Sequence, residues 1–236
     1  MNWNIDTFKV KWQRLVPALI IFVTVLSYAN SFNAPFILDD LFIILSNKDI
    51  IDPWVFTSFS RFLVDISFKI NYLLSGSNAV DYHLVNTGIH VAAALLLYGL
   101  VRRTLRLPLF QAVGFNRADA IAFIAAGIWA VHPLQTQCIT YISQRYEAAM
   151  GLFVLLTLYC FVRGTETKSR GWVALSLAAC FAGMGTKEVI VVLPLLVLMY
   201  DYVFVSVGMR DLLKQRWTFH VWIFASLVFF VVLLIS

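Results

Sequence analysis

The sequence predicts an all-α protein: a polytopic bundle of about seven transmembrane helices with one amphipathic helix in its first outer loop. Three observations support this fold class: 61% of the residues are hydrophobic, only 13% are charged, and the mean hydropathy is +0.81. Soluble domains carry about 25% charged residues, so a chain this poor in charge is typical of an integral membrane protein. We expect residues 1–236 to form a single transmembrane module.

Seven apolar segments account for the predicted spans. A helix that crosses a bilayer needs about 20 apolar residues, with a range near 17–25. The third, fourth and fifth segments are shorter, so we expect polar flanks that face other helices to extend them, or one of them to be re-entrant. The segments are residues 15–28, 84–101, 120–131, 148–162, 172–183, 189–204 and 219–235.

The lysines and arginines predict the orientation of the bundle. Thirteen of the 18 basic residues precede the first segment or lie in every second connection, and connections rich in Lys and Arg stay in the cytoplasm. We therefore expect a cytoplasmic N-terminus and an outer C-terminus, in a bacterial inner membrane, with the outer connections in a periplasm or an organelle lumen. The five basic residues on the outer side are Lys48, Arg61, Lys69, Arg145 and Lys187.

The first outer loop, residues 31–83, is predicted to hold the amphipathic helix. Asp52-Pro53 is typical of a helix start, and the turn cluster Ser75–Asn78 is typical of a helix end. Arg61, Asp65 and Lys69 lie at four-residue steps on the polar side, where they can pair with one another. We expect the helix to lie in the membrane interface. Its apolar positions, at helical spacing, are Phe59, Phe62, Leu63, Ile66, Ile70, Leu73 and Leu74.

Asp39 and Asp40 form an acid pair a few residues after the first apolar segment. Charged carboxylates this close to hydrocarbon are costly, so such residues usually line a cavity or bind a ligand. A carboxylate here is suited to take a proton from a hydroxyl that attacks a sugar carbon. The structural alternative is that one of the pair caps a helix beginning at Leu41.

Two later connections, predicted on the same side as the acid pair, contain Arg145 and Lys187 with the supporting residues His132, Glu147 and Glu188. Arginine and lysine can bind the phosphate of a lipid-linked donor and stabilise its charge as it leaves. Each residue also has a structural alternative. In that alternative, Arg145 and Glu147 serve as interface anchors or as an ion pair. Lys187 and Glu188 then form an ordinary loop pair, and His132 ends a helix.

Several familiar kinds of site are missing from the sequence. The three cysteines have no metal-ligand spacing and suit packing, and we find no phosphate-binding glycine loop and no nucleotide-binding fold. Dispersed basic residues do not suggest a nucleic-acid partner. A lipid-phosphate donor therefore fits better than a nucleotide sugar. The sequence predicts no metal site, although a divalent cation remains an open alternative.

Short motifs follow one another along nearly the whole chain: Pro35–Asp40, Ser67–Tyr72, Tyr82–Asn86 with His90, His132–Thr136, Tyr141–Glu147, Gly185–Glu188, Leu193-Pro194 and Tyr200-Asp201. In this order they resemble the first half of the GT-C glycosyltransferases, specifically the tetratricopeptide-linked membrane O-mannosyltransferases and their bacterial relatives. The family usually has an acid where this chain has Gln137, and Arg-Pro where this chain has Arg61-Phe62.

The resemblance implies a polyprenyl-phosphate sugar donor, a protein or glycan acceptor and an active site at the outer face. It places the catalytic base on Asp39 or Asp40, and Arg145 and Lys187 near the donor phosphate. The alternative is a shortened, catalytically inactive GT-C-like chain that serves as a structural subunit among other membrane subunits. A transporter would show charges at mid-membrane or a repeated half, and we find neither.

Overall fold

The structure is a computed structural model that describes residues 5–52, 54–55, 60–111, 117–206 and 208–235. Within these ranges the chain is helical and contains no strand, which confirms the all-α prediction. The α-helices are α1 (Ile5–Tyr28), α2 (Lys48–Ile51), α3 (Phe62–Ser75), α4 (Ala79–Thr104), α5 (Pro108–Gln111), α6 (Ala118–Val131), α7 (Thr136–Thr140), α8 (Arg145–Thr167), α9 (Arg170–Gly183), α10 (Leu193–Tyr200) and α11 (Met209–Ile235). The 3-10 helices are η1 (Ala29–Ser31), η3 (Pro133–Gln135), η4 (Ile142–Gln144) and η5 (Glu188–Val192), and the π-helical turns are η2 (Leu41–Leu45) and η6 (Asp201–Val205).

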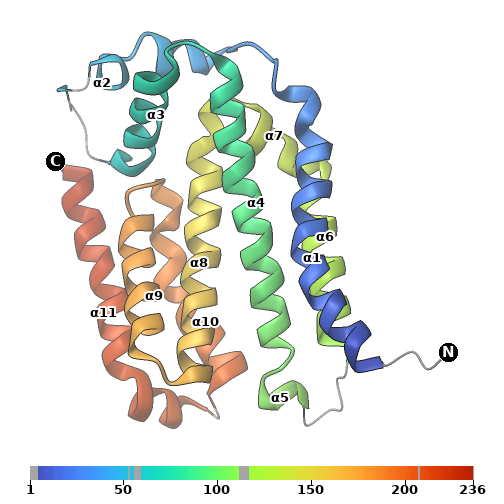
Figure 1. The fold of residues 1–236 in the computed structure, drawn as a ribbon. Helices are drawn as coiled ribbons and strands as arrows, with labels where there is room; N and C mark the ends of the chain where they lie inside the picture. Colours follow the sequence, from blue (N-terminus) through green and yellow to red (C-terminus); the bar gives the residue numbers. More distant parts are fainter. Residues whose placement is uncertain (1–4, 53, 56–59, 112–116, 207, 236) are drawn as a thin grey trace.

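The long helices run up and down, with α4 and α8 in the middle of the bundle (Figure 1). Helix α4 packs against α6 on one side and against α8 on the other, and α8 packs against α9. Helices α1 and α6 lie at one flank of the bundle, and α9, α10 and α11 lie at the other. This order brings the connections that precede α3, α8 and η5 to the same end of the molecule.

Three apolar clusters stabilise the bundle. Small residues such as Ala94, Ala122 and Ala126 join α4 to α6, and small side chains let membrane helices approach closely. A larger cluster joins α8 to α9, α10 and α11, with Phe161 stacked on Phe219. The third cluster lies at the end of the bundle that carries α3, where it supports the candidate site.

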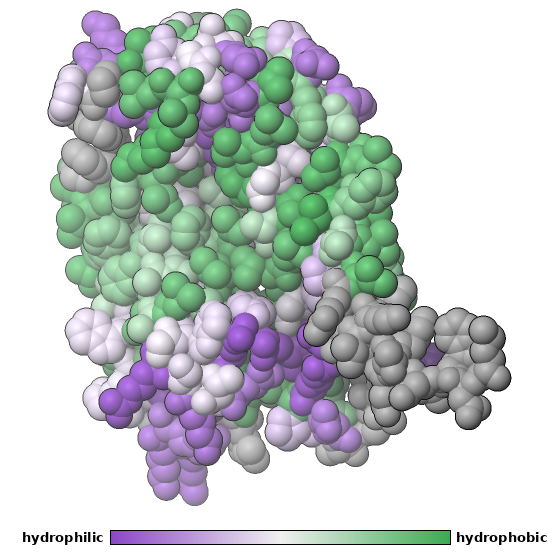
Figure 2. All heavy atoms as spheres, in the orientation of Figure 1, coloured by the Kyte–Doolittle hydropathy of each residue, from purple (hydrophilic) through white to green (hydrophobic). Residues whose placement is uncertain are grey.

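All seven apolar segments of the sequence fall in helices, but they differ in length. Four described stretches are long and apolar enough to cross a membrane: Ala79–Thr104, Ile142–Thr167, Glu188–Val205 and Lys214–Ile235. Ala118–Val131 and Pro133–Thr140, bent by 50°, make a fifth if they count as one span. Leu15–Ser31 and Arg170–Gly183 are shorter apolar helices. An apolar band between two polar ends is visible on the surface (Figure 2), as expected for an integral membrane protein.

The amphipathic helix is present as α3 and ends at Ser75, followed by Gly76 with a φ of 56°. Two residues used to predict its start, Pro53 and Phe59, lie outside the described residues. Asp52 does not cap α3, because it is the C-cap of the short helix α2 and its side chain accepts the backbone N–H of Trp54 at 2.9 Å.

The charged residues at the start of α3 and along it contact neighbouring segments. Arg61 bonds to Glu188, Asp65 accepts a hydrogen bond from Tyr146, and Lys69 donates to the carbonyl of Val55. The charges of Arg61 and Lys69 also act to lower the pKa of Asp65, so the expected interaction at four-residue steps exists alongside these outside contacts. The apolar residues Ile70, Leu73 and Leu74 are exposed on the opposite side.

Candidate functional site

The two predicted catalytic acids have different surroundings. The Asp40 side chain is only 1% exposed, and its oxygens accept the backbone N–H of Ser143 at 2.7 Å and of Ile37 at 3.1 Å. Asp39 is exposed, and its backbone N–H donates to the hydroxyl of Tyr141 at 2.9 Å. Asp40 thus joins the first outer loop to the segment before α8, while the carboxylate of Asp39 is open to solvent.

The backbone around the acid pair is strained. Leu38 has a φ of 47°, a left-handed conformation that is uncommon for a bulky residue and that often marks functional sites. Asp40 has helical backbone angles and makes no side-chain capping bond to the π-helical turn that begins at Leu41. The alternative that Asp40 caps this helix is therefore wrong, because its carboxylate reaches back to Ile37 and across to Ser143.

Arg145, predicted to bind donor phosphate, is completely buried at the start of α8. Its guanidinium donates to Asn86 Oδ1 at 2.7 Å, to Ser67 Oγ at 3.2 Å and to the carbonyl of Tyr82 at 3.3 Å. The Phe68 ring lies 4.2 Å from the guanidinium carbon, within cation–π distance. Arg145 therefore joins α3, α4 and α8 through neutral groups, and it is not the ion-pair partner of Glu147.

The other predicted phosphate ligand, Lys187, forms an ion pair with Glu147 on the first turn of α8. Glu188 forms a bidentate pair with Arg61, at 2.8 Å to Nε and 3.1 Å to the terminal nitrogen. Lys187 and Glu188 are therefore not a loop pair with each other. Each fixes η5 to a different neighbour, α8 or the residue before α3.

Asp65 and Tyr146 connect these ion pairs to α3. The hydroxyl of Tyr146 donates to Asp65 at 2.6 Å, and the guanidinium carbon of Arg61 lies 5.2 Å from the centre of the Tyr146 ring. Burial raises the pKa of Asp65, although the hydrogen bond from Tyr146 and the charge of Arg61 oppose this shift.

His132 lies at the boundary between α6 and η3. Its Nδ1 accepts the backbone N–H of Leu134 at 3.2 Å, and its own backbone N–H donates to the carbonyl of Trp129. Its ring is exposed. The structure thus gives His132 the helix-boundary contacts named as its alternative.

The segment 141–147 brings the predicted site residues to one end of the bundle. Tyr141 and Ser143 contact the acid pair, and Glu147 contacts Lys187. Sequence reasoning missed Asn86, which accepts from Arg145 and donates to the carbonyl of Ile142 at 3.1 Å. Its only sequence signal was its place in the Tyr82–Asn86 motif. Sequence reasoning also missed the tie between Asp65 and Tyr146, since no local pattern joins residues 81 positions apart.

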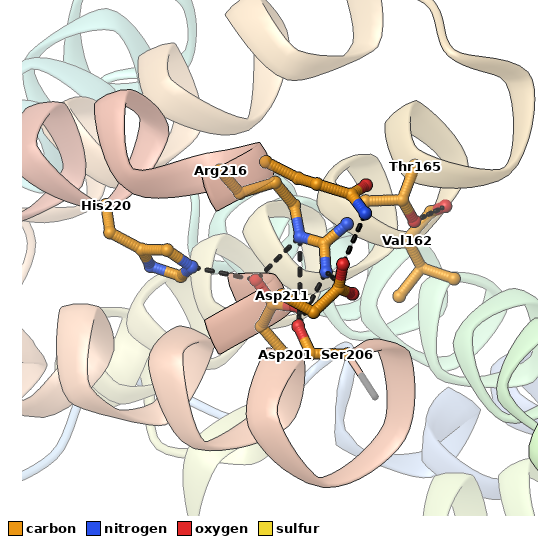
Figure 3. A network of polar contacts seen from close by, with 8 residues as sticks. Val162, Thr165, Asp201, Ser206, Asp211, Arg216 and His220 are labelled. Atoms are coloured by element: carbon orange, nitrogen blue, oxygen red, sulfur yellow. Dashed lines mark hydrogen bonds and ion pairs between the residues drawn. The ribbon is translucent and has the colours of Figure 1, made fainter. Parts of the chain in front are cut away.

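A separate polar network lies at the opposite end of the bundle (Figure 3). Asp201, at the junction of α10 and η6, accepts from Arg216 at 2.9 Å, from His220 at 2.8 Å and from Ser206 at 2.8 Å. These contacts fix the π-helical turn to α11. The arrangement supports a structural role for Asp201 at a helix boundary.

Among the described residues, no group of three or more His, Cys, Asp or Glu side chains is placed to hold a metal ion. The carboxylates at the candidate site instead take hydrogen bonds from backbone and tyrosine groups or pair with Arg61 and Lys187. This end of the bundle therefore contains the exposed carboxylate of Asp39 and two cation–carboxylate pairs.

Comparison with known proteins gives consistent matches. A family profile described as dolichyl-phosphate-mannose-protein mannosyltransferase matches residues 62–235. The chain is 30% identical over 216 residues to "Protein O-mannosyl-transferase Tmtc2" of Drosophila melanogaster, covering 80% of this chain and 21% of that protein. It is 28% identical over 207 residues to "Protein O-mannosyl-transferase TMTC4" of Mus musculus, covering 75% of this chain and 27% of that protein. The aligned part thus spans only about a fifth to a quarter of these relatives. No solved structure matches.

Proposed function

Because the chain belongs to the dolichyl-phosphate-mannose-protein mannosyltransferase family, we propose that it transfers a sugar from a polyprenyl-phosphate donor to a hydroxyl of a protein or glycan. The donor is a dolichyl-type lipid phosphate mannose, as the family description indicates. The reaction is an inverting transfer at the end of the bundle where Asp39 lies. The names of the matched relatives, which are O-mannosyl-transferases, support the same reaction class.

The observation that carries this proposal is the exposed carboxylate of Asp39, set by strained backbone at Leu38 and by the bond to Tyr141. An acid free of competing hydrogen bonds in the described structure is suited to general-base catalysis. Asp39 takes the proton of the acceptor hydroxyl as that oxygen bonds to the anomeric carbon. The bond between this carbon and the phosphate oxygen breaks, and the polyprenyl phosphate leaves with the electron pair.

Asp40 and Arg145 position the site in this proposal. Asp40, buried between two backbone N–H groups, holds the loop of Asp39 against Ser143. Arg145 holds the start of α8 against α3 and α4. Lys187 faces the leaving phosphate, and Glu147 keeps the lysine in place while the donor is absent. His132 and Glu188 support the surrounding helix ends.

We further propose that all seven apolar segments cross the membrane, with the N-terminus cytoplasmic and the C-terminus outside, in a bacterial inner membrane. The two short helices, Leu15–Ser31 and Arg170–Gly183, reach across with the aid of polar flanks. Helix α3 lies in the outer interface with Ile70, Leu73 and Leu74 toward lipid. This arrangement keeps the donor's lipid tail in the bilayer while its phosphate reaches Lys187.

The test is transfer of radiolabelled mannose from polyprenyl-phosphate mannose to membrane proteins by the purified chain in proteoliposomes. Asp39→Asn should lower transfer about 100-fold or more, the contribution expected of a general base. Asp52→Asn, which changes an exposed acid in the same outer segment, is the matched control and should retain transfer. Normal transfer by folded Asp39→Asn would refute the assignment of the base.

A second function, a structural subunit without catalysis, is favoured by one observation: Lys187 is paired with Glu147 and Arg145 is buried among protein groups. In that case both cations stabilise helix packing. A structural subunit should co-purify stably with other membrane proteins. Added donor lipid should not protect its Lys187 from an acylating reagent. Donor-dependent protection of Lys187 would contradict it.

A further inference from the structure

A groove of about 760 Å³ lies on the bundle at the end opposite to Asp39. Helix α4 and helix α8 form its walls, and Pro17 of α1 borders it. This volume lies within the range of roughly 300–1,000 Å³ that is typical of small-molecule sites. The apolar part of its lining includes Ala92, Leu95, Leu96, Leu152 and Leu156.

The floor of the groove is made by close contact between α4 and α8. An added Cβ at Gly99 would lie 2.6 Å from the Tyr159 ring, so only glycine allows the ring to lie against α4 at this point. Tyr98 also lines the groove and is only 6% exposed, yet its hydroxyl has no hydrogen-bond partner among the described residues. This hydroxyl lies beneath the surface of the groove, so Tyr98 contributes its ring to the wall.

One end of the groove is basic. Arg102, Arg103 and Arg106 line it, and the nearby carboxylates are Asp119, which bonds Arg102 and Arg106, and Glu166, which bonds Arg103. Three cations against two carboxylates leave this cluster positive. Each guanidinium has five N–H donors, and the bonds to Asp119 and Glu166 occupy only part of them.

The distance between the apolar and basic ends matches one leaflet of a bilayer. Ala92 and Arg103 are eleven residues apart on α4, which is about 16 Å along a helix. Half of a hydrocarbon core of about 30 Å is about 15 Å. The groove therefore runs from near mid-membrane to the surface at the basic end.

We propose that this groove binds one anionic glycerophospholipid of the leaflet at the basic end of the bundle. The acyl chains lie along Leu95, Leu96 and Leu152, and the phosphate lies among Arg102, Arg103 and Arg106. The positive cluster favours an anionic group, and the apolar wall beside it favours a lipid over a free anion. The site is remote from Asp39, so it does not depend on the proposed sugar transfer.

The test measures lipid retention by native mass spectrometry of the purified chain released from mixed vesicles of phosphatidylglycerol and phosphatidylcholine. The chain should retain phosphatidylglycerol in preference to phosphatidylcholine. Arg106→Gln should lower retention about fivefold, the effect expected of one arginine near an anionic headgroup. Ala92→Phe should lower it by filling the apolar end without changing any charge.

Lys214→Gln is the matched control, because Lys214 is an exposed cation at the start of α11 that does not line the groove. It should leave retention unchanged. Equal retention of the two lipids, or equal losses for Arg106→Gln and Lys214→Gln, would overturn the proposal. Displacement of the lipid by excess inorganic phosphate would show a simple anion site and would also overturn it. Circular dichroism and thermal melting check that each variant is folded. If Arg106→Gln does not fold, Ala92→Phe still tests the proposal.

Discussion

Asp40 accepts the backbone N–H of Ser143 at 2.7 Å, across 103 positions of sequence. The bond fixes the first outer loop to the segment that leads into α8, and it buries a carboxylate next to an exposed one. Adjacent identical residues thus have different surroundings, because neighbouring side chains in a tight turn point in different directions.

Asp40→Asn should reduce stability more than Asp39→Asn. The substitution weakens the two N–H bonds to a charged acceptor, each of which contributes about 1.5–3 kcal/mol. Asp39→Asn removes no side-chain hydrogen bond that the structure describes. Thermal melting in detergent, followed by tryptophan fluorescence, checks this difference. Equal melting temperatures for the two variants would contradict the structural role of Asp40.

Arg145→Lys should be strongly destabilising although it keeps the positive charge. A lysine ammonium cannot reach Asn86, Ser67 and the Tyr82 carbonyl with the planar fork that arginine provides. A loss of about 3 kcal/mol corresponds to a fall in melting temperature on the order of 10 °C. Arg170→Lys, at an exposed position, is the control and should melt like the parent chain.

Gly185→Ala should loosen the docking of α3. An added Cβ would lie 2.3 Å from the Phe62 ring, and the Gly185 carbonyl accepts the Leu63 N–H at 3.1 Å. Overpacking of this kind costs about 1–3 kcal/mol. Gly88→Ala is the matched control, since nothing lies within 4 Å of its added Cβ. Proteolysis near α3 should increase in the first variant and not in the second.

The contribution of Asp65 to the free energy of unfolding should fall as the pH rises. Its folded-state pKa is raised above the ordinary value of 3.8, so the folded chain binds more protons than the unfolded chain between those two values. Stability therefore decreases with pH across that window. Asp65→Asn should lack this slope. The difference between the two melting-temperature curves, from pH 3.5 upward (about the ordinary carboxyl value), isolates the contribution of Asp65. A parallel pair of curves would contradict it.

Arg61 and Glu188 should show modest coupling. Both side chains are 40% exposed, so solvent screens their attraction, and the coupling energy in a double-mutant cycle should be about 0.5–1 kcal/mol. Arg61→Gln, Glu188→Gln and the double variant form the cycle. Added salt should reduce the coupling, and no measurable coupling at low salt would show that the pair only orients η5.

Much of the fold follows from the sequence because hydrophobic length and basic connections are local signals. The seven apolar segments, the amphipathic helix ending at Ser75 and the gathering of residues 39–40, 145–147 and 187–188 at one end all follow from such signals. The bend at Pro133 also follows, because proline interrupts a helix.

The pairing within the site could not be predicted, because it depends on helix rotation. Glu147 pairs with Lys187 and not with Arg145, and Lys69 is buried, with its amine on the carbonyl of Val55. Residues two positions apart on a helix point about 200° apart, so a small rotation decides which one reaches a neighbour. The exposure of Asp39 and the burial of Asp40 depend on tertiary packing in the same way.

The contacts of Arg145 have a consequence for biosynthesis. Ser67, Tyr82 and Asn86 leave the ribosome before Arg145 does, so its acceptors can already be in place when α8 enters the membrane. A circular permutation that placed α8 ahead of α3 and α4 would deliver the guanidinium without acceptors. Quality-control proteases should degrade such a chain, so it should accumulate poorly even though its finished fold would contain the same contacts.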